Sequence, residues 1–229
     1  MLGSPRLLFQ KPDDSRAIPQ NRKEHSGERF TMEEGSAKTI ARMNSGRHGK
    51  GYWNRVGILM VRWIIRSGGQ TGVDRAALQV AVKRGLPYVG WCPRGGLAED
   101  CPTPPGILAQ FPNLVETPSA DPRQRTAWNV RDSHATVIVV DEQGFKRSRG
   151  TRFTRTVAEL IFVRPWRAVT LDNLDAPSQI VVWLKQLRLD RGEGSLVVNF
   201  AGPRESQAPG IQARARRFID DLFAELVES

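Results

Sequence analysis

The chain has 229 residues, of which 34 are lysine or arginine and 24 are aspartate or glutamate, so its formal net charge is +10. A hydrophobic content of 39% argues against a wholly disordered protein, and the presence of only two cysteines excludes a disulfide scaffold. No apolar run approaches the roughly 18–20 residues of a membrane helix, and no secretory signal is recognisable, so we expect a cytoplasmic protein with no membrane partner.

The positive charge is divided unevenly along the chain. Residues 1–59 hold 11 basic and 6 acidic side chains, whereas residues 60–229 hold 23 and 18, so about a quarter of the chain carries half of the excess. Residues 1–59 show no sustained hydrophobic period, and we expect a disordered basic extension there, followed by one ligand-binding domain at 60–229. The extension is either an arm that contacts nucleic acid or a segment without function, and its sparse aromatic side chains favour the second interpretation.

From residue 60 onward, short strand-like apolar runs alternate with longer stretches of helical period. Val73, Ala76, Ala77, Val80 and Ala81, for example, share one face of a helix. This alternation predicts an α/β domain with a mostly parallel sheet and helices on both faces, in which ligands bind at the carboxyl ends of the strands. Strands are expected at 61–65, 88–91, 135–140, 168–171 and 196–200, and helices at 73–84, 123–133, 151–162, 177–187 and 211–226.

The loop after the first strand combines glycines with polar side chains. Glycine lets the backbone approach a ligand closely, and free N–H groups at the start of the next helix attract an anion such as phosphate. The spacing matches neither the dinucleotide fingerprint nor the Walker loop, and a simple glycine-rich turn is the alternative. We favour a ligand site made by Gly68, Gly69, Gln70, Thr71, Gly72, Asp74 and Arg75.

The loop after the last strand has a similar character. Gly202 opens it, Arg204 has the geometry to bind a phosphate or a carboxylate, and Glu205 and Ser206 follow. Glu205 is a candidate for a ribose hydroxyl or a metal, and a surface ion pair with Arg204 is the alternative. We expect these four residues to contribute to the same ligand site.

A third candidate loop follows the central strand at 135–140. Gly150 and Thr151 begin the next helix, where N–H groups and a hydroxyl suit phosphate, although a flexible basic loop explains the pattern equally well. Arg94, Asn129 and Arg131 are further candidates for ligand contact. No nucleophilic triad and no metal site is recognisable from spacing, so we assign neither catalytic residues nor metal ligands.

Several long strings resemble those of the "putative molybdenum carrier" family, a circularly permuted branch of the SLOG superfamily with a Rossmann-like fold. The resemblance spans about residues 63–226. It is carried by SGGQTGVDRAAL at 67–78, GWCP at 90–93, AED at 98–100, ETPS at 116–119, Arg125 with WNVRDS at 128–133, and AGPRES at 201–206.

The resemblance implies a Rossmann-like three-layer sandwich that binds a phosphorylated or nucleotide-derived ligand, with the molybdenum cofactor (molybdopterin) as the named candidate. The resemblance implies that the ligand is bound by the residues at 68–72, by Asp74, and by the residues at 202 and 204–206. Family members often have a Gly-Gly-Thr or Gly-Ser-Thr pattern after the central strand, of which only Gly150 and Thr151 are present here. Related phosphoribohydrolases place a catalytic acid soon after that pattern, where this chain has Thr154.

We therefore interpret the chain as a non-catalytic carrier of a small phosphorylated ligand, with molybdoenzymes as the implied partners. A nucleotide-processing hydrolase or a sensor of nucleotide-derived ligands is the alternative. The arginines of the domain lie near the strand ends, which suits a small anion better than nucleic acid. The sequence leaves a homo-oligomer open.

Overall fold

A computed structural model describes residues 63–173, 175–192 and 194–227. The predicted disordered extension at 1–59 and the start of the strand expected at 61–65 lie outside these residues. The division of the chain at residue 60 therefore stays a prediction. Within the described part, no helix is both long and apolar enough to cross a membrane.

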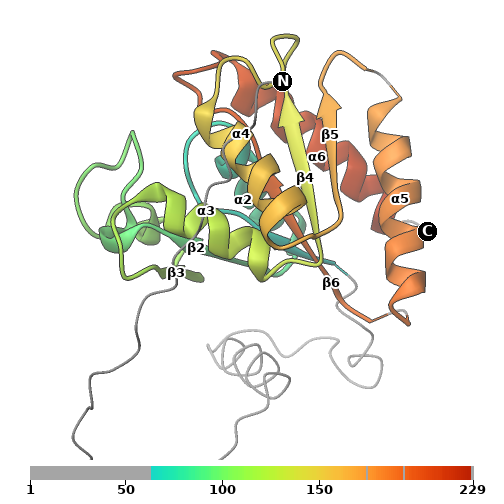
Figure 1. The fold of residues 1–229 in the computed structure, drawn as a ribbon, viewed down its shortest axis with the longest axis horizontal. Helices are drawn as coiled ribbons and strands as arrows, with labels where there is room; N and C mark the ends of the chain where they lie inside the picture. Colours follow the sequence, from blue (N-terminus) through green and yellow to red (C-terminus); the bar gives the residue numbers. More distant parts are fainter. Residues whose placement is uncertain (1–62, 174, 193, 228–229) are drawn as a thin grey trace, which may run out of the picture. The chain divides into compact units, whose positions relative to one another are not determined.

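The domain is built around a six-stranded sheet in which every pair of neighbouring strands is parallel (Figure 1). The strand order is β3-β2-β1-β6-β4-β5. This confirms the predicted α/β, Rossmann-like class. The strands are β1 (Trp63–Arg66), β2 (Tyr88–Cys92), β3 (Leu114–Glu116), β4 (Ala135–Val140), β5 (Trp166–Thr170) and β6 (Leu196–Ala201).

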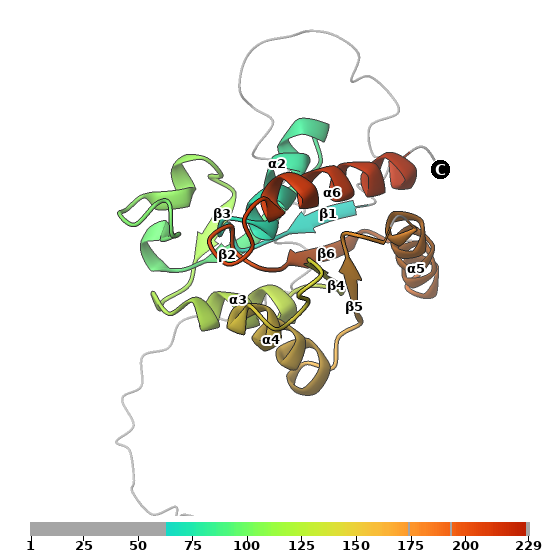
Figure 2. The same cartoon turned by 90° about the horizontal axis from the view of Figure 1, so that it is seen from above.

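Helices cover both faces of the sheet, and Figure 2 shows the resulting three layers. One face carries α2 (Val73–Arg84), α5 (Ala176–Asp190) and α6 (Ile211–Val227), which share a single hydrophobic core with the sheet. The other face carries α3 (Pro122–Arg131) and α4 (Arg149–Thr156), which continues into a π-helical turn (Val157–Ile161). Two short 3-10 turns, Arg94–Gly96 and Gly106–Ala109, lie between β2 and β3.

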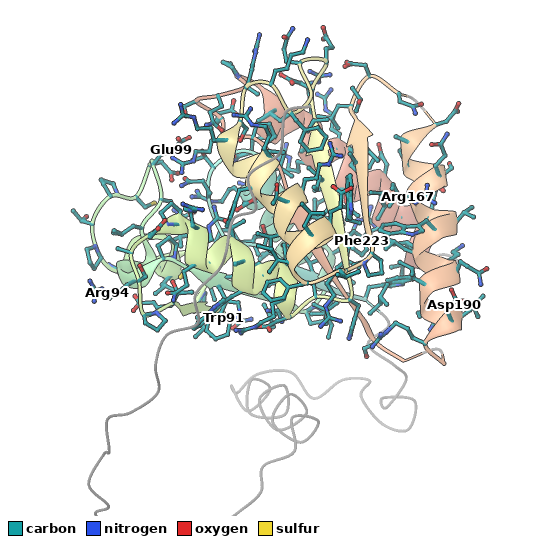
Figure 3. The ribbon with its side chains drawn as sticks, viewed as in Figure 1. Trp91, Arg94, Glu99, Arg167, Asp190 and Phe223 are labelled. Atoms are coloured by element: carbon teal, nitrogen blue, oxygen red, sulfur yellow. The ribbon has the colours of Figure 1, made fainter. Side chains whose placement is uncertain are left out.

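The larger core lies between the sheet and the helices α2, α5 and α6. Phe223 of α6, which is labelled in Figure 3, is fully buried in it together with Phe200 of β6, and their ring centroids are 5.9 Å apart. On the opposite face, Val130, Val157 and Ala158 form a smaller core. All six residues of β4 are buried, as expected for an inner strand covered on both faces. The buried strands therefore fix the positions of the loops that follow them, which contain the candidate site residues.

The structure departs from the predicted elements at two strands. The sequence predicts no strand or helix between 91 and 123, but this segment contains β3, which pairs with β2 at the edge of the sheet. With only three residues, β3 is too short to show a hydrophobic period. β5 begins at Trp166, two residues before the predicted start, because the ladder with β4 already begins there.

His134 joins the start of β4 to β6 through two hydrogen bonds. The imidazole Nδ1 of His134 accepts a hydrogen bond from the backbone N–H of Val197 at 2.9 Å. The backbone N–H of His134 donates to the carbonyl of Val197 at 2.9 Å. Burial, together with the nearby Arg191, Arg164 and Arg66, lowers the pKa of His134 from 6.5 to about 4. Neutral imidazole is the form that this strand contact requires.

The lowered pKa predicts a loss of stability in acid. Since the folded state resists protonation of His134, the free energy of unfolding should fall by about 1–3 kcal/mol as the pH drops from 6.5 to 4. In His134→Asn the amide oxygen replaces the acceptor but does not titrate. Urea unfolding of both proteins across this range should show a steeper fall for wild type. Parallel profiles would show that His134 is not the titrating group.

Candidate functional site

A pocket with a volume of about 570 Å³ opens at the carboxyl ends of β1 and β6, beside the first turns of α3 and α4. Four segments that are distant in sequence meet there, which places the pocket where parallel α/β sheets usually bind ligands. Its lining residues are Gln70, Asp74, Pro122, Arg123, Arg125, Thr126, Asn129, Ser148, Arg149, Gly150, Phe153, Thr154, Asn199, Ala201, Gly202, Arg204 and Gln207.

A buried ion pair joins the loop after β1 to α3. The Nη1 of Arg125 lies 2.6 Å from Oδ2 of Asp74, and the two side chains are only 12% and 6% exposed. The backbone N–H of Gln70 also donates to the Asp74 carboxylate. Burial raises the pKa of Asp74 even though Arg125 acts in the opposite direction. A Cβ atom at Gly68 would lie 2.0 Å from Arg125 Nη1, so the glycine makes room for this pair.

Three N–H groups at the start of α2 are bonded to protein acceptors. Thr71 N donates to the side-chain oxygen of Gln70 at 3.1 Å, Gly72 N donates to Gln212 at 3.0 Å, and Val73 N donates to the Pro203 carbonyl at 3.3 Å. The sequence predicts that N–H groups at this helix start are free to hold an anion. The N–H groups of Gly72 and Val73 instead tie the loop after β1 to α6 and to the loop after β6.

Glycine makes the contact between these two loops close. Gly72 has φ +78°, and a Cβ there would lie 2.2 Å from the Pro203 carbonyl oxygen. A Cβ on Gly202 would lie 2.3 Å from the Val139 carbonyl and 2.4 Å from a methyl of Val73. The predicted loops at 67–75 and 199–206 are thus brought together, and the glycines serve packing between them.

Glu99 adds a third segment to this junction. It accepts hydrogen bonds from the hydroxyls of Thr71 and Ser206, the latter at 2.7 Å, and its N–H donates to Gln70 at 2.8 Å. Burial works to raise the pKa of Glu99, but these hydroxyls outweigh it and the pKa is lowered. Glu205 accepts from the N–H groups of Gly210 and Gln212, at 2.6 and 2.9 Å, and so holds the first turn of α6. Thr71, Glu205 and Ser206 lie at the junction and not in the pocket lining.

Arg75 and Gly69 also build the scaffold. Arg75 is buried, its Nε and Nη2 donate to the Gly69 carbonyl, and its guanidinium forms a two-pronged ion pair with Asp100 at 3.0 and 2.9 Å. Gly69 has φ +74° and packs against Ile107 and Leu114. The sequence predicts that Arg75 binds the ligand. In the structure its guanidinium holds the segment around Asp100.

Arg94, Asn129 and Arg131 are the further candidates for ligand contact, and only Asn129 is among the lining residues. Its side-chain amide also forms hydrogen bonds with the backbone N–H and carbonyl of Trp91, at 2.8 and 2.9 Å. Arg94 is exposed at the outer end of the segment between β2 and β3, outside the pocket lining (Figure 3). Arg131 also lies outside the lining, paired with Asp132 and stacked on Trp128 with its guanidinium carbon 4.7 Å from the ring centroid.

The third predicted loop does reach the pocket. Gly150 lines it together with Ser148, whose hydroxyl accepts the N–H of Thr151 at 3.1 Å and caps α4. Thr151 is buried just outside the lining, and its own hydroxyl has no hydrogen-bond partner among the described residues. Gly150 is exposed, so ligand access to this helix start is open.

The sequence interpretation missed several pocket residues. Arg123 and Phe153 face each other across α3 and α4, with the guanidinium carbon 4.9 Å from the ring centroid. Arg149 begins α4, and Arg125 holds Asp74. Arg149 belongs to the basic loop before Gly150, and Arg125 is one of the residues that carry the family resemblance. Nothing in the sequence indicates that either residue lies next to the glycine-rich loops. With Arg204, the lining holds four arginines and one aspartate, a net formal charge of +3.

Metal ligation has no evident support from the protein side chains. Among the described residues, no group of three or more His, Cys, Asp and Glu side chains is arranged to hold a metal ion. The two cysteines, Cys92 and Cys101, are free thiols, and burial raises the pKa of Cys92 to about 11. A neutral Cys92 thiol is consistent with its place in the small apolar cluster around Leu78.

Comparison with known proteins gives two findings. The sequence pattern described as "Circularly permutated YpsA SLOG family" matches residues 65–223. Among solved structures, the chain is similar to the crystal structure of a "Putative molybdenum carrier protein" from Syntrophus aciditrophicus SB, with 34% sequence identity and a TM-score of 0.59. That match covers 72% of this chain and 94% of the other. A search of curated proteins finds no match.

The close contact of the two loops predicts an unequal response to alanine at two glycines. Gly72 and Gly85 both have positive φ, but only Gly72 faces backbone atoms where a Cβ would lie. Gly85→Ala should cost about 1–2 kcal/mol of stability from the backbone conformation alone. Gly72→Ala should cost a further 1–3 kcal/mol or so, because the loops must separate and because ψ of −133° at Gly72 lies outside the left-handed region that Gly85 occupies. Urea unfolding measures both, and equal losses would refute the packing role of Gly72.

Proposed function

Because the chain belongs to the circularly permutated YpsA SLOG family, we propose that its pocket binds a phosphate-bearing pterin or nucleotide-like ligand and that the protein acts as a carrier. The family resemblance of the strings between 67 and 206 is confirmed by the match to residues 65–223. The observation that carries the proposal is the pocket lining, in which four arginines face a single aspartate.

The chemistry of the lining suits a phosphorylated ligand. Guanidinium groups bind phosphate through paired N–H donors and keep their charge at any physiological pH. A cleft that concentrates one sign of charge also raises the local concentration of an oppositely charged ligand. Arg204, one of the predicted ligand residues, lines the pocket directly after β6, and Arg149 lines it at the start of α4.

The molybdenum cofactor is the first candidate for the cargo. The name of the similar structure points to it, and the lining offers groups that fit a phosphorylated pterin. The arginines suit its phosphate, and the amide nitrogens of Gln70 and Gln207 supply donors for the polar edge of a pterin ring. The metal itself would arrive as part of the cargo. Molybdoenzymes in the cytoplasm are the acceptors that we propose.

A nucleotide-processing hydrolase remains the second candidate, and one observation favours it. Asp74 lies in the pocket with a pKa raised by burial, as catalytic carboxyl groups often do. Its carboxylate is held by Arg125, however, and Glu205 is engaged at the start of α6 outside the pocket lining. Incubation with nucleoside monophosphates, followed by chromatography, decides between the two. Turnover that disappears in Asp74→Asn, in a variant that circular dichroism melting shows to be folded, would establish the hydrolase.

The carrier proposal predicts a matched difference between two arginine variants. Arg204→Ala removes a pocket cation and should weaken the binding of AMP, or of a pterin phosphate, by about tenfold or more, as expected for a charge-assisted contact. Arg217→Ala removes an exposed arginine of α6 outside the pocket lining and should leave the affinity unchanged. Isothermal titration calorimetry of the full chain measures both.

Two results would contradict the proposal. Wild-type protein that binds neither AMP nor a pterin phosphate at saturating concentration would remove the ligand site. Equal losses in the two variants would show that binding follows the overall charge of the protein, not the pocket.

A further inference from the structure

The pocket arginines differ in how far their charge is compensated. Asp74 is the one carboxylate of the lining and forms its ion pair with Arg125. No ion pair of Arg123, Arg149 or Arg204 is found within the described residues. Arg123 and Arg149 therefore face the pocket without a carboxylate partner, whereas Arg204 makes no direct ion pair but acts electrostatically on both Asp74 and Glu99.

These cations fall into an inner and an outer group. Arg125 and Arg204 are partly buried, and burial raises the pKa of Asp74 while both of these arginines act to lower it, which places them close to that carboxylate. Arg123 and Arg149 are exposed and stand at the first turns of α3 and α4. Among the lining residues, the inner group with Asp74 has a net formal charge of +1 and the outer group has +2, and Glu99 outside the lining is a further carboxylate near Arg204.

One arginine of the outer group is packed against a neighbouring ring. The guanidinium of Arg123 stacks on Phe153, with its carbon 4.9 Å from the ring centroid, which limits its motion. Arg149 is the first residue of α4, whose cap is Ser148, and Gly150 beside it exposes backbone at the pocket. Positive charge and a helix start together favour a group with two negative charges at this place.

We infer that the ligand of this pocket carries a diphosphate, with its inner phosphoryl group at Arg204 and its terminal phosphoryl group between Arg123 and Arg149. A terminal phosphoryl group carries about two negative charges near neutral pH, which matches the outer pair. The phosphoryl group that links it to the rest of the ligand carries one, which matches the inner group. A monophosphate satisfies one group and leaves the other facing solvent.

This inference rests on the proposed function and narrows it: among phosphate-bearing pterins and nucleotide-like ligands, it selects those that carry a diphosphate over those with a single phosphate. The experiment is calorimetric titration of the full chain with AMP and ADP, and with phosphate and pyrophosphate, at one fixed ionic strength. We expect each diphosphate to bind about tenfold more tightly than its monophosphate partner. Arg149→Ala and Arg204→Ala, which each remove one group's contact, should both reduce this ratio to less than about threefold. Arg217→Ala should preserve it.

The outcomes separate the two claims. If AMP binds and ADP binds no more tightly, the diphosphate inference is overturned and the proposed phosphate site stands. If the ratio exists but survives in both pocket variants, the assignment to these arginines is wrong. If no compound binds, both claims fail. Circular dichroism melting of each variant establishes that it is folded, and Arg149 is exposed enough that its replacement leaves the core untouched.

Discussion

The arrangement of the site depends on the buried contact between Asp74 and Arg125. It connects the first turn of α2 with α3, which pack on opposite faces of the sheet, and it does so at the edge where the strands end. A buried ion pair is costly to break from one side, because the remaining charge is left without a partner. Asp74 is the single carboxylate of the pocket lining, and its direct ion pair is with Arg125. The other arginines of the lining are therefore available to pair with a ligand.

The glycine-rich loops also make packing contacts that their composition does not indicate. The N–H groups of Thr71, Gly72 and Val73 bond to Gln70, Gln212 and Pro203, and the glycines allow the loops to touch. The loops thus form a rigid support, and side chains from α3, α4 and the loop after β6 supply the cations. A site with its supporting contacts already satisfied changes little on binding, which favours affinity for a small anion.

The sequence predicts the fold better than the site. The 3.6-residue period and the glycine positions are local signals, and they identify every helix longer than eight residues and five of the six strands. Contacts such as Gly72 with Gln212 join residues 140 positions apart, so nothing local predicts that the N–H group is occupied. Arg123 and Arg149 reach the pocket only because α3 and α4 pack together. Arg204 and Gly150 were found because they follow strands directly.

A crystal structure of the protein soaked with pyrophosphate tests the central claim most directly, because it shows where an anion binds. The account predicts density in the pocket, with one phosphoryl group in contact with Arg204 and the other with Arg123 and Arg149. Density at the start of α2, against the N–H groups of Gly72 and Val73, would contradict it, because these groups would then have to leave their protein partners. A pocket without density at saturating pyrophosphate would contradict it as well.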